Sequence, residues 1–279
     1  MKFWINKDAF TMIGLLLTLL LTVSVVQVDA QEASEHPPDA SELAKQTQNP
    51  VASLISVPFQ FNFNSGGGLG DGTFFNLNFQ PVIPFRLNDE WNMIARTIVP
   101  VISLPGPQGL RFSGIADIQE QIFISPAKSG RLIWGLGPIV SIPAATTAPA
   151  QTGSWAAGPT FVALTMPGHW VLGALVNNVW TFADSGDSTE VNQFLLQPFV
   201  NYNFGKGWAI STGPGITANW DAPDGQKWTV PMGIGIGRTL VFDKRPMTLA
   251  VQYYHNVEHP DNVAANQVRF QITLLYPKK

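Results

Sequence analysis

The sequence has no cysteine and few charged side chains. Without cysteine, disulfide bridges and thiolate metal sites are excluded. Charged residues make up 13% of the chain, whereas soluble domains usually carry about 25%. The mean hydropathy is only +0.10, well below that of proteins built from transmembrane helices. The formal net charge is −3 and no basic patch stands out, so we expect no nucleic-acid partner.

Long apolar runs are also missing after residue 30, which argues against helical membrane spans in that part of the chain. Before it, an apolar run extends from Ala9 to Val28 and is followed by Val28-Asp29-Ala30, which resembles a signal-peptidase site. We therefore expect residues 1–30 to be a cleaved signal peptide. An uncleaved anchor is the alternative, because the run is long enough to span a membrane.

The region after the signal peptide is polar and lacks strand patterning. Residues 31–56 are predicted to be a periplasmic leader, and residues 57–279 the folded domain. Between Gln31 and Gln48 the leader contains Pro37-Pro38 and several acidic residues, so we expect it to be mobile, with one or two helical turns from Ser41 to Gln46.

The rest of the chain alternates apolar and polar residues with a period of two, which is the signature of strands. In the segment Val57–Asn64, Phe59 and Phe61 share one face, and Gln60 and Asn62 share the other. Residues 75–80 and 267–276 repeat this scheme. Nine further strands are predicted between them, approximately over Trp91–Ile102, Gly114–Ser125, Leu132–Ile142, Trp155–Thr165, Trp170–Phe182, Val191–Phe204, Trp208–Trp220, Trp228–Leu240 and Met247–Val257.

The connections between these strands alternate in length. Residues 65–72, 103–113, 143–154 and 183–190 form long loops, whereas residues 87–89, 167–168, 205–207 and 243–245 form short turns. Long loops outside, short turns inside and an even number of strands are typical of bacterial outer-membrane barrels. The predicted fold class is therefore all-β, a closed antiparallel transmembrane β-barrel of about twelve strands.

Aromatic residues favour a barrel over a soluble sandwich. Tryptophans recur near the ends of the segments, as expected for two interfacial girdles; they are Trp91, Trp155, Trp170, Trp180, Trp208, Trp220 and Trp228. Closure also satisfies every backbone polar group in hydrocarbon, which an open sheet does not. Prolines inside the segments are expected to mark bulges, because each removes a ladder hydrogen bond; they are Pro138, Pro159, Pro198 and Pro214.

Five short motifs carry a resemblance to a known family: Gly135–Pro138 (GLGP), Ala157–Pro159 (AGP), Pro198–Phe204 (PFVNYNF), Thr217–Trp220 (TANW) and Val230–Gly237 (VPMGIGIG). With them the chain resembles a family of outer-membrane proteins associated with the meta-cleavage pathway of phenol degradation. Some bacterial members bear the name of the peptide hormone neuromedin U, which a signal peptide and a barrel pattern contradict. The resemblance implies movement of small molecules and supplies no catalytic set.

One departure from this family's pattern concerns an acidic residue. Such sequences tend to read Gly-x-Gly-Asp where this chain has Gly114-Ile115-Ala116-Asp117. The resemblance therefore assigns no role to Asp117.

The inward face of the barrel is predicted to be rich in amides and poor in charge. By register, ten residues are expected to line the lumen: Arg96, Asp117, Gln119, Gln121, Asn177, Gln197, Asn201, Gln252, Arg269 and Gln271. One interpretation is a narrow pore for small, weakly polar solutes, since no ring of single-sign charge is evident. The other is that Arg96, Asp117 and Arg269 form a satisfied network that only fills a narrow barrel, because side chains or the leader can obstruct the modest lumen of twelve strands.

Two charges do not fit the predicted pattern. Glu120 falls on the apolar face of the fourth strand and suggests a bulge or a register error there. Arg238 also falls on an apolar face, but its long side chain can reach the inner interface.

The sequence offers no catalytic constellation, cofactor motif or metal site. His255 and His259 lie near an outer loop with Glu258 and Asp261, and Asp184, Asp187 and Glu190 form an acidic loop; both groups are expected to be solvated.

We therefore expect an exported protein of the Gram-negative outer membrane that lets a small molecule pass. The preference for a weakly polar or aromatic molecule is what the family resemblance implies. The protein's expected partners are outer-membrane lipid, that solute and the barrel-assembly machinery. The alternatives are an outer-membrane hydrolase with its site at the outer rim, and a blocked structural or adhesive barrel.

Overall fold

The computed structural model describes residues 40–67, 72–128, 130–184, 186, 188–242 and 245–276. The expected signal peptide and leader residues 31–39 lie outside these ranges. Within the described residues, no helix is both long and apolar enough to cross a membrane.

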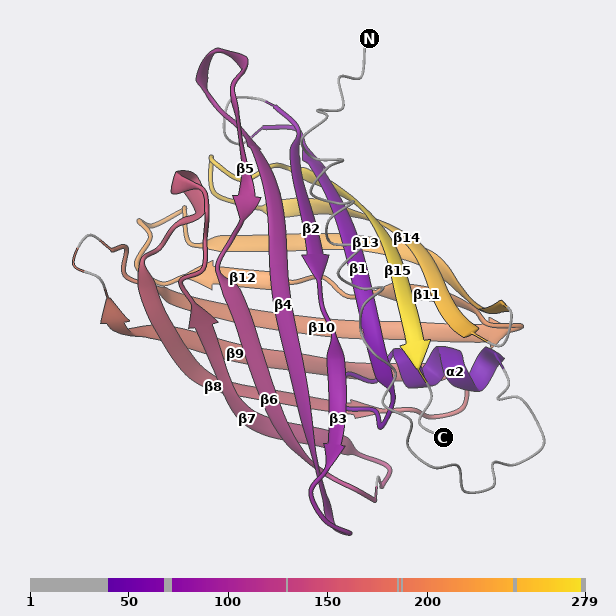
Figure 1. Cartoon of the computed structure of the whole chain (residues 1–279). Coiled ribbons are helices and arrows are strands. Elements are labelled where there is room, and N and C mark those ends of the chain that lie inside the picture. Colours follow the sequence, from indigo (N-terminus) through magenta and orange to yellow (C-terminus); the bar gives the residue numbers. More distant parts are fainter. Residues whose placement is uncertain are drawn as a thin grey trace. The chain divides into compact units, whose positions relative to one another are not determined.

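The described chain contains one short α-helix, two single-turn 3-10 helices at Pro107–Gly109 and Ala148–Ala150, and a series of strands (Figure 1). Their bounds are α2 (Ala40–Thr47), β1 (Ile55–Ser65), β2 (Phe74–Phe79), β3 (Val82–Arg86), β4 (Trp91–Pro105), β5 (Arg111–Ile115), β6 (Ile118–Pro126), β7 (Ile133–Ile142), β8 (Ser154–Thr165), β9 (Trp170–Asp184), β10 (Asn192–Gly205), β11 (Trp208–Thr212), β12 (Ile216–Asn219), β13 (Trp228–Phe242), β14 (Arg245–Glu258) and β15 (Asn266–Tyr276).

The strands form one closed antiparallel barrel. The strands follow one another around the barrel in chain order, β9 pairs with β10, and β1 pairs with β15 from Ile55–Tyr276 to Ser65–Asn266, so the sheet closes on itself. Three strands of the barrel are interrupted, and each consists of two segments: β2 and β3, β5 and β6, and β11 and β12. The 15 segments therefore make a 12-strand barrel. The predicted fold class is confirmed.

The second strand of the barrel, formed by β2 and β3, is longer than the sequence pattern predicted. It continues past Pro81 as β3, which pairs with β4 from Val82–Arg96 to Arg86–Asn92. Pro81 has no N–H, so the ladder breaks there, although its carbonyl still accepts a hydrogen bond from the Thr97 N–H at 3.1 Å. The break hides the second half of the strand from a pattern based on alternation.

The four named prolines do not mark bulges, contrary to prediction, although Pro231 of β13 lies beside one. Register shifts occur at Trp155/Ala156, Asn203/Gly205 and Val230/Pro231. Pro138 pairs directly with Pro159, and both point outward, whereas Pro214 lies in the break between β11 and β12. A proline lacks the backbone N–H donor but adds no extra residue to the strand, as a bulge would. The pairing register therefore continues past an exposed proline.

The barrel interior has two unlike halves. Inward residues of β3, β4 and β6–β9 form a buried apolar cluster that includes Ile94, Phe123 and Leu175. Inward residues of β1, β14 and β15 are polar, and in register Gln60 faces Gln271 and Asn62 faces Arg269. We name these the apolar half and the amide half.

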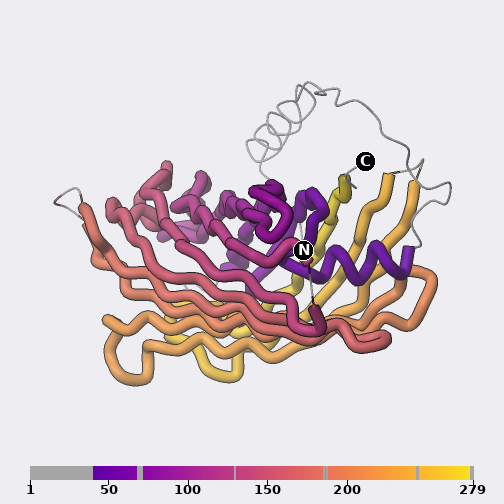
Figure 2. The backbone as a smooth tube through the Cα atoms, turned by 90° about the horizontal axis from the view of Figure 1, so that it is seen from below, coloured from indigo at the N-terminus to yellow at the C-terminus, as the bar shows by residue number. Residues whose placement is uncertain are grey.

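The described part of the leader packs inside the barrel, which corrects the prediction of a mobile segment for residues 40–48. Helix α2 covers the turns expected from Ser41 to Gln46, and Leu43 and Ala44 are buried. A Cβ added at Gly207, in the β10–β11 turn, would lie 3.4 Å from the Ala40 Cβ, so the helix lies at the turn end of the barrel (Figure 2). Beyond it, Val51 joins the apolar half.

Aromatic side chains gather at both ends of the barrel. At the turn end, the rings of Trp91 and Trp134 lie 6.0 Å apart and those of Trp170 and Tyr202 4.7 Å apart. At the loop end, Trp220 contacts Trp228 at 5.4 Å, and its indole N–H donates to the Asn178 side chain at 2.8 Å. This arrangement agrees with two girdles at membrane interfaces.

The two misfit charges occupy regular positions on the outer face. β6 pairs with β4 without a register shift, and Glu120 lies opposite Thr97, so the predicted bulge at Glu120 is wrong. The Thr97 hydroxyl donates to the Glu120 carboxylate at 2.6 Å. The Arg238 guanidinium lies 5.2 Å from the centre of the Trp208 ring, near the β10–β11 turn, where its charge can reach the interface.

Candidate functional site

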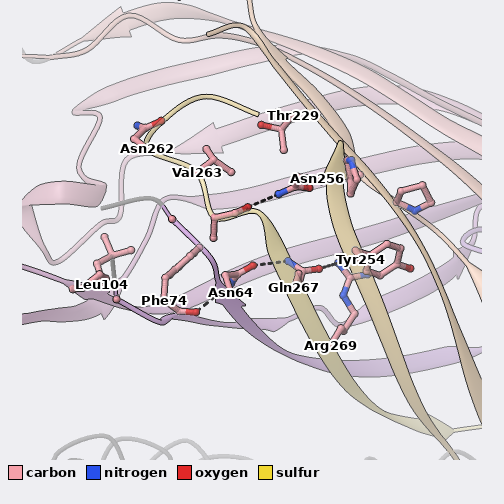
Figure 3. Close-up of a pocket in the computed structure, with 17 residues that line it drawn as sticks. Asn64, Phe74, Leu104, Thr229, Tyr254, Asn256, Asn262, Val263, Gln267 and Arg269 are labelled. Carbon is pink, nitrogen blue, oxygen red and sulfur yellow. Dashed lines mark hydrogen bonds between the residues drawn. The ribbon is translucent and has the colours of Figure 1, made fainter. Parts of the chain in front are cut away.

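The barrel interior holds two neighbouring cavities. The outer one has a volume of about 290 Å³ and opens toward the long loops (Figure 3). Much of its wall is apolar and comes from Phe74, Leu104, Pro105, Pro231 and Val263. Asn64, Tyr254, Gln267 and Arg269 place polar groups along one side.

The inner cavity, of about 220 Å³, lies between the leader and the barrel wall. Leader residues from Ala44 to Leu54 line one side of it. The Gln48 side chain exchanges two hydrogen bonds of 3.0 Å with the side chain of Asn203 on β10, so the leader is held by a specific polar contact. Arg269 lines both cavities and therefore stands where they meet.

A chain of amide side chains crosses the wall of the inner cavity. Arg96 donates to the Gln80 side-chain oxygen at 2.8 Å, and Gln80 donates to Gln60 at 3.0 Å. Gln60 donates to Gln271 at 3.1 Å, and Gln271 donates to the Thr273 hydroxyl at 3.0 Å. Each of the three glutamine amides both accepts and donates a hydrogen bond. The series therefore has one direction, from the Arg96 guanidinium to the Thr273 hydroxyl.

Arg269 is held by a second set of neutral groups. Its Nε donates to the Asn62 oxygen at 2.8 Å, and its Nη2 donates to the Gln267 oxygen at 3.0 Å. The guanidinium also lies 5.2 Å from the centre of the Tyr254 ring. These contacts fix the cation at the boundary between the cavities without neutralising its charge.

Part of the outer cavity is bounded by an interrupted stretch of wall. β10 pairs with β12 up to Leu196–Ile216 and with β11 from Val200–Thr212, which leaves Gly213–Gly215 outside the ladder. The Gly213 N–H donates to the Tyr254 hydroxyl at 3.1 Å, and its carbonyl accepts from Gln197 at 3.3 Å. Side chains from the interior thus replace the missing backbone bonds.

The structure brings together six of the ten residues predicted to line the lumen. Around the inner cavity lie Arg96, Gln197, Asn201, Gln252, Arg269 and Gln271. Gln121 and Asn177 are buried in the wall, and Gln119 is paired opposite Ser141. Gln121 still contacts one of the six residues around the inner cavity, because its side-chain oxygen lies 3.4 Å from Arg96 Nη1.

Asp117 is placed apart from both arginines. Its carboxylate accepts hydrogen bonds from the Ala145 N–H at 3.1 Å and the Thr152 hydroxyl at 2.6 Å, and it borders a third cavity of about 450 Å³ among outer-loop residues. The alternative network of Arg96, Asp117 and Arg269 is therefore not formed.

The outer-loop histidines contact neutral groups. His255 Nδ1 lies 3.0 Å from the Asn266 side-chain oxygen, and His259 Nδ1 lies 2.9 Å from the Pro260 carbonyl. Among the described residues there is no cluster of three potential metal ligands. Asp187 of the acidic loop lies outside the described residues.

The sequence left open whether the leader obstructs the lumen, and it identified no leader residue as part of the site. Leu43, Val51 and Leu54 are buried, and their apolar character within a polar segment was the available signal. Gln60 and Gln80 were also missed as site residues, although both lie on the polar faces that the alternation identifies.

The solved structures that are similar to this chain include the following two. One is an outer membrane channel from Pseudomonas putida F1, with a TM-score of 0.60 and 13% identity over 90% of this chain and 100% of that one. The other is the NanC porin, with a TM-score of 0.52 and 10% identity over 79% of this chain and 98% of that one. At these identities the likeness shows a shared barrel fold.

No protein-family model matches the sequence, and no curated protein matches it. The resemblance to the phenol meta-pathway family therefore stays a prediction.

Proposed function

We propose that the protein is a passive channel or facilitator of the outer membrane for a small, weakly polar or aromatic molecule. The observation that carries this proposal is the pair of cavities, about 290 and 220 Å³, that meet at Arg269 inside a closed barrel. Pockets for drug-sized ligands measure roughly 300–1,000 Å³, so these cavities suit a molecule of about one ring.

The lining of the path supports a weakly polar solute. The outer cavity has apolar walls, and the inner cavity lies between the apolar half and neutral amide groups, with Arg96 and Arg269 as the two cations of its lining. Amides exchange hydrogen bonds with a polar substituent without the desolvation cost of a charged ring. The sequence resemblance to proteins associated with phenol degradation points to the same class of solute.

An outer-membrane location agrees with the closed sheet, the aromatic ends and the exposed apolar side chains of the outer face. Outer-membrane lipid and the barrel-assembly machinery are then the partners that this location requires. The hydrolase alternative is disfavoured because both outer-loop histidines contact neutral oxygens rather than a serine. A blocked barrel remains the rival, since the leader narrows the inner cavity.

A permeation assay in cells tests the proposal. A Gram-negative host with an esterase in its periplasm hydrolyses phenyl acetate, a neutral aromatic ester, at a rate set by passage through the outer membrane. We expect expression of the protein to raise this rate. Ser211→Trp should abolish the increase, because Ser211 lines the inner cavity.

Ile210→Trp is the matched control, since Ile210 is the neighbouring residue and is exposed on the opposite, outer face. It should leave the rate unchanged. Equal rates with and without the protein would support the blocked barrel instead.

A further inference from the structure

Two cations in the barrel interior have no acidic partner among the described residues. Arg96 and Arg269 both line the inner cavity, and each binds side-chain amide oxygens. The salt bridges of the described residues are Arg86–Asp89 and Lys227–Asp224, neither of which involves these arginines. Buried charges are normally paired, because removing an ion from water without compensation is costly.

Both guanidinium groups keep donors to spare. Arg96 Nε and Arg269 Nη1 make no hydrogen bond to any described residue, whereas the remaining nitrogens each bind one amide oxygen. The side-chain nitrogen of Gln121, beside Arg96, is also buried without a partner. Excess donors and excess positive charge at one place match a ligand that brings acceptors and negative charge.

The position of Arg269 defines the shape of such a ligand. The guanidinium lies at the inner end of the outer cavity, whose walls include Phe74, Leu104 and Pro231 (Figure 3). A molecule with its apolar body in this cavity would therefore direct its acidic group toward Arg269. Arg96 lies on the inner cavity, farther along the same path.

We propose that Arg269 and Arg96 form a two-step relay for the carboxylate of a small aromatic acid. The carboxylate binds first to Arg269 and then to Arg96, while the ring follows through the outer cavity. This inference rests on the proposed channel function and narrows its solute to a monoanion with an apolar body. Two arginines on a path otherwise lined by apolar and neutral amide side chains match one negative charge rather than several.

A pair of probes of nearly the same shape tests the relay. In the periplasmic-esterase host, 4-acetoxybenzoate supplies the monoanion and 4-acetoxybenzamide the neutral counterpart. We expect the protein to raise hydrolysis of the benzoate above that in cells without it. Arg269→Gln should lower this increase by about tenfold or more, as expected for loss of a charge-assisted hydrogen bond, and leave the benzamide rate unchanged.

Two further variants separate charge from folding. Arg269→Lys keeps the cation and should retain most of the benzoate passage, and Arg96→Gln should lower it as Arg269→Gln does. Arg131→Gln removes an exposed charge remote from both cavities and should change neither rate. Heat-dependent mobility in gel electrophoresis verifies that each variant is a folded barrel.

The outcomes distinguish the relay from the channel function. Benzoate passage that is equal in the native protein and in folded Arg269→Gln and Arg96→Gln overturns the relay. A parallel loss of benzoate and benzamide passage also overturns it, because a change of pore shape then explains the result. Passage of the benzamide alone in the native protein overturns the relay and leaves the proposed function standing. Failure of both probes and of phenyl acetate contradicts both proposals.

Discussion

The two halves of the barrel interior differ in how they are held together. The apolar half, on β3, β4 and β6–β9, packs side chains such as Phe123 and Leu175 against Val51 of the leader. The amide half, on β1, β14 and β15, is held by hydrogen bonds between side chains and borders both cavities. The apolar half thus stabilises the barrel by packing, and the amide half supplies a lining with which a solute can exchange hydrogen bonds.

The wall of the barrel also differs from place to place in how closely its strands approach. In the apolar half, β6 and β7 approach so closely that a Cβ at Gly137 would overlap the carbonyl oxygen of Ile122. On the opposite side, Gly213 lies outside the ladder, and a Cβ there would meet the Phe199 Cβ at 3.8 Å, an ordinary contact. Strands approach as closely where β13 pairs with β14, since a Cβ at Gly233 would overlap the carbonyl oxygen of Tyr253. The loose stretch of wall is therefore local to the break between β11 and β12.

The largest expected effect comes from adding one methyl group to the tight wall. Gly137→Ala should prevent formation of the barrel, because the methyl group would meet backbone atoms that cannot turn away. Gly213→Ala should fold normally. The fraction of each variant that refolds into lipid vesicles, measured by heat-dependent gel mobility, checks both statements. Equal refolding of the two variants would refute the contrast between the walls.

The second-largest expected effect is a difference in stability between a substitution in the apolar half and one in the amide half. Phe123 is fully buried, so Phe123→Ala should lower the free energy of unfolding by about 3–5 kcal/mol. Gln271 loses two hydrogen bonds when changed to Ala, but water in the adjoining cavity can replace them, so the cost should be about 1 kcal/mol.

Urea unfolding of the refolded barrels, followed by tryptophan fluorescence, measures both values. A larger loss for Gln271→Ala than for Phe123→Ala would mean that the amide network, and not the apolar packing, stabilises the barrel.

The smallest effect concerns the outer face. Glu120 exposes a carboxylate among apolar neighbours, so Glu120→Gln should raise the free energy of unfolding by about 1 kcal/mol or less, as expected for removal of a charge facing lipid. The Thr97 hydroxyl can still donate to the new amide oxygen. The same urea titration checks this value, and a destabilised variant would show that the charge itself serves the fold.

The sequence predicted the barrel well because most strands alternate clearly. In β15, for example, Val268, Phe270 and Ile272 face outward, while Arg269 and Gln271 face inward. The alternation weakens where both faces are apolar, as in β8, where Phe161 lies outside and Val162 and Leu164 lie in the core. The apolar half was therefore not anticipated, and the interior was predicted to be mostly amide.

The site was predicted less completely, for two physical reasons. Register assigns residues such as Arg269 and Gln271 to the inward face, but it does not say which inward residues border a cavity and which pack against others, as Gln121 does. The leader has no strand register, so only its tertiary contacts show that Gln48 binds Asn203 and that Val51 enters the core. Asp117 was assigned inward by register but bonds to the adjacent loop.

Single-channel conductance in a planar bilayer tests most directly whether a solute path runs through the barrel and is narrowed by the leader. The protein should be compared with a form that lacks residues Gln31 to Gln48, which removes α2 and the contact of Gln48 with Asn203. We expect small, steady openings from the longer form and a conductance several-fold larger from the shorter one. Equal conductance would contradict the role given to the leader, and silence in both forms would contradict the channel itself.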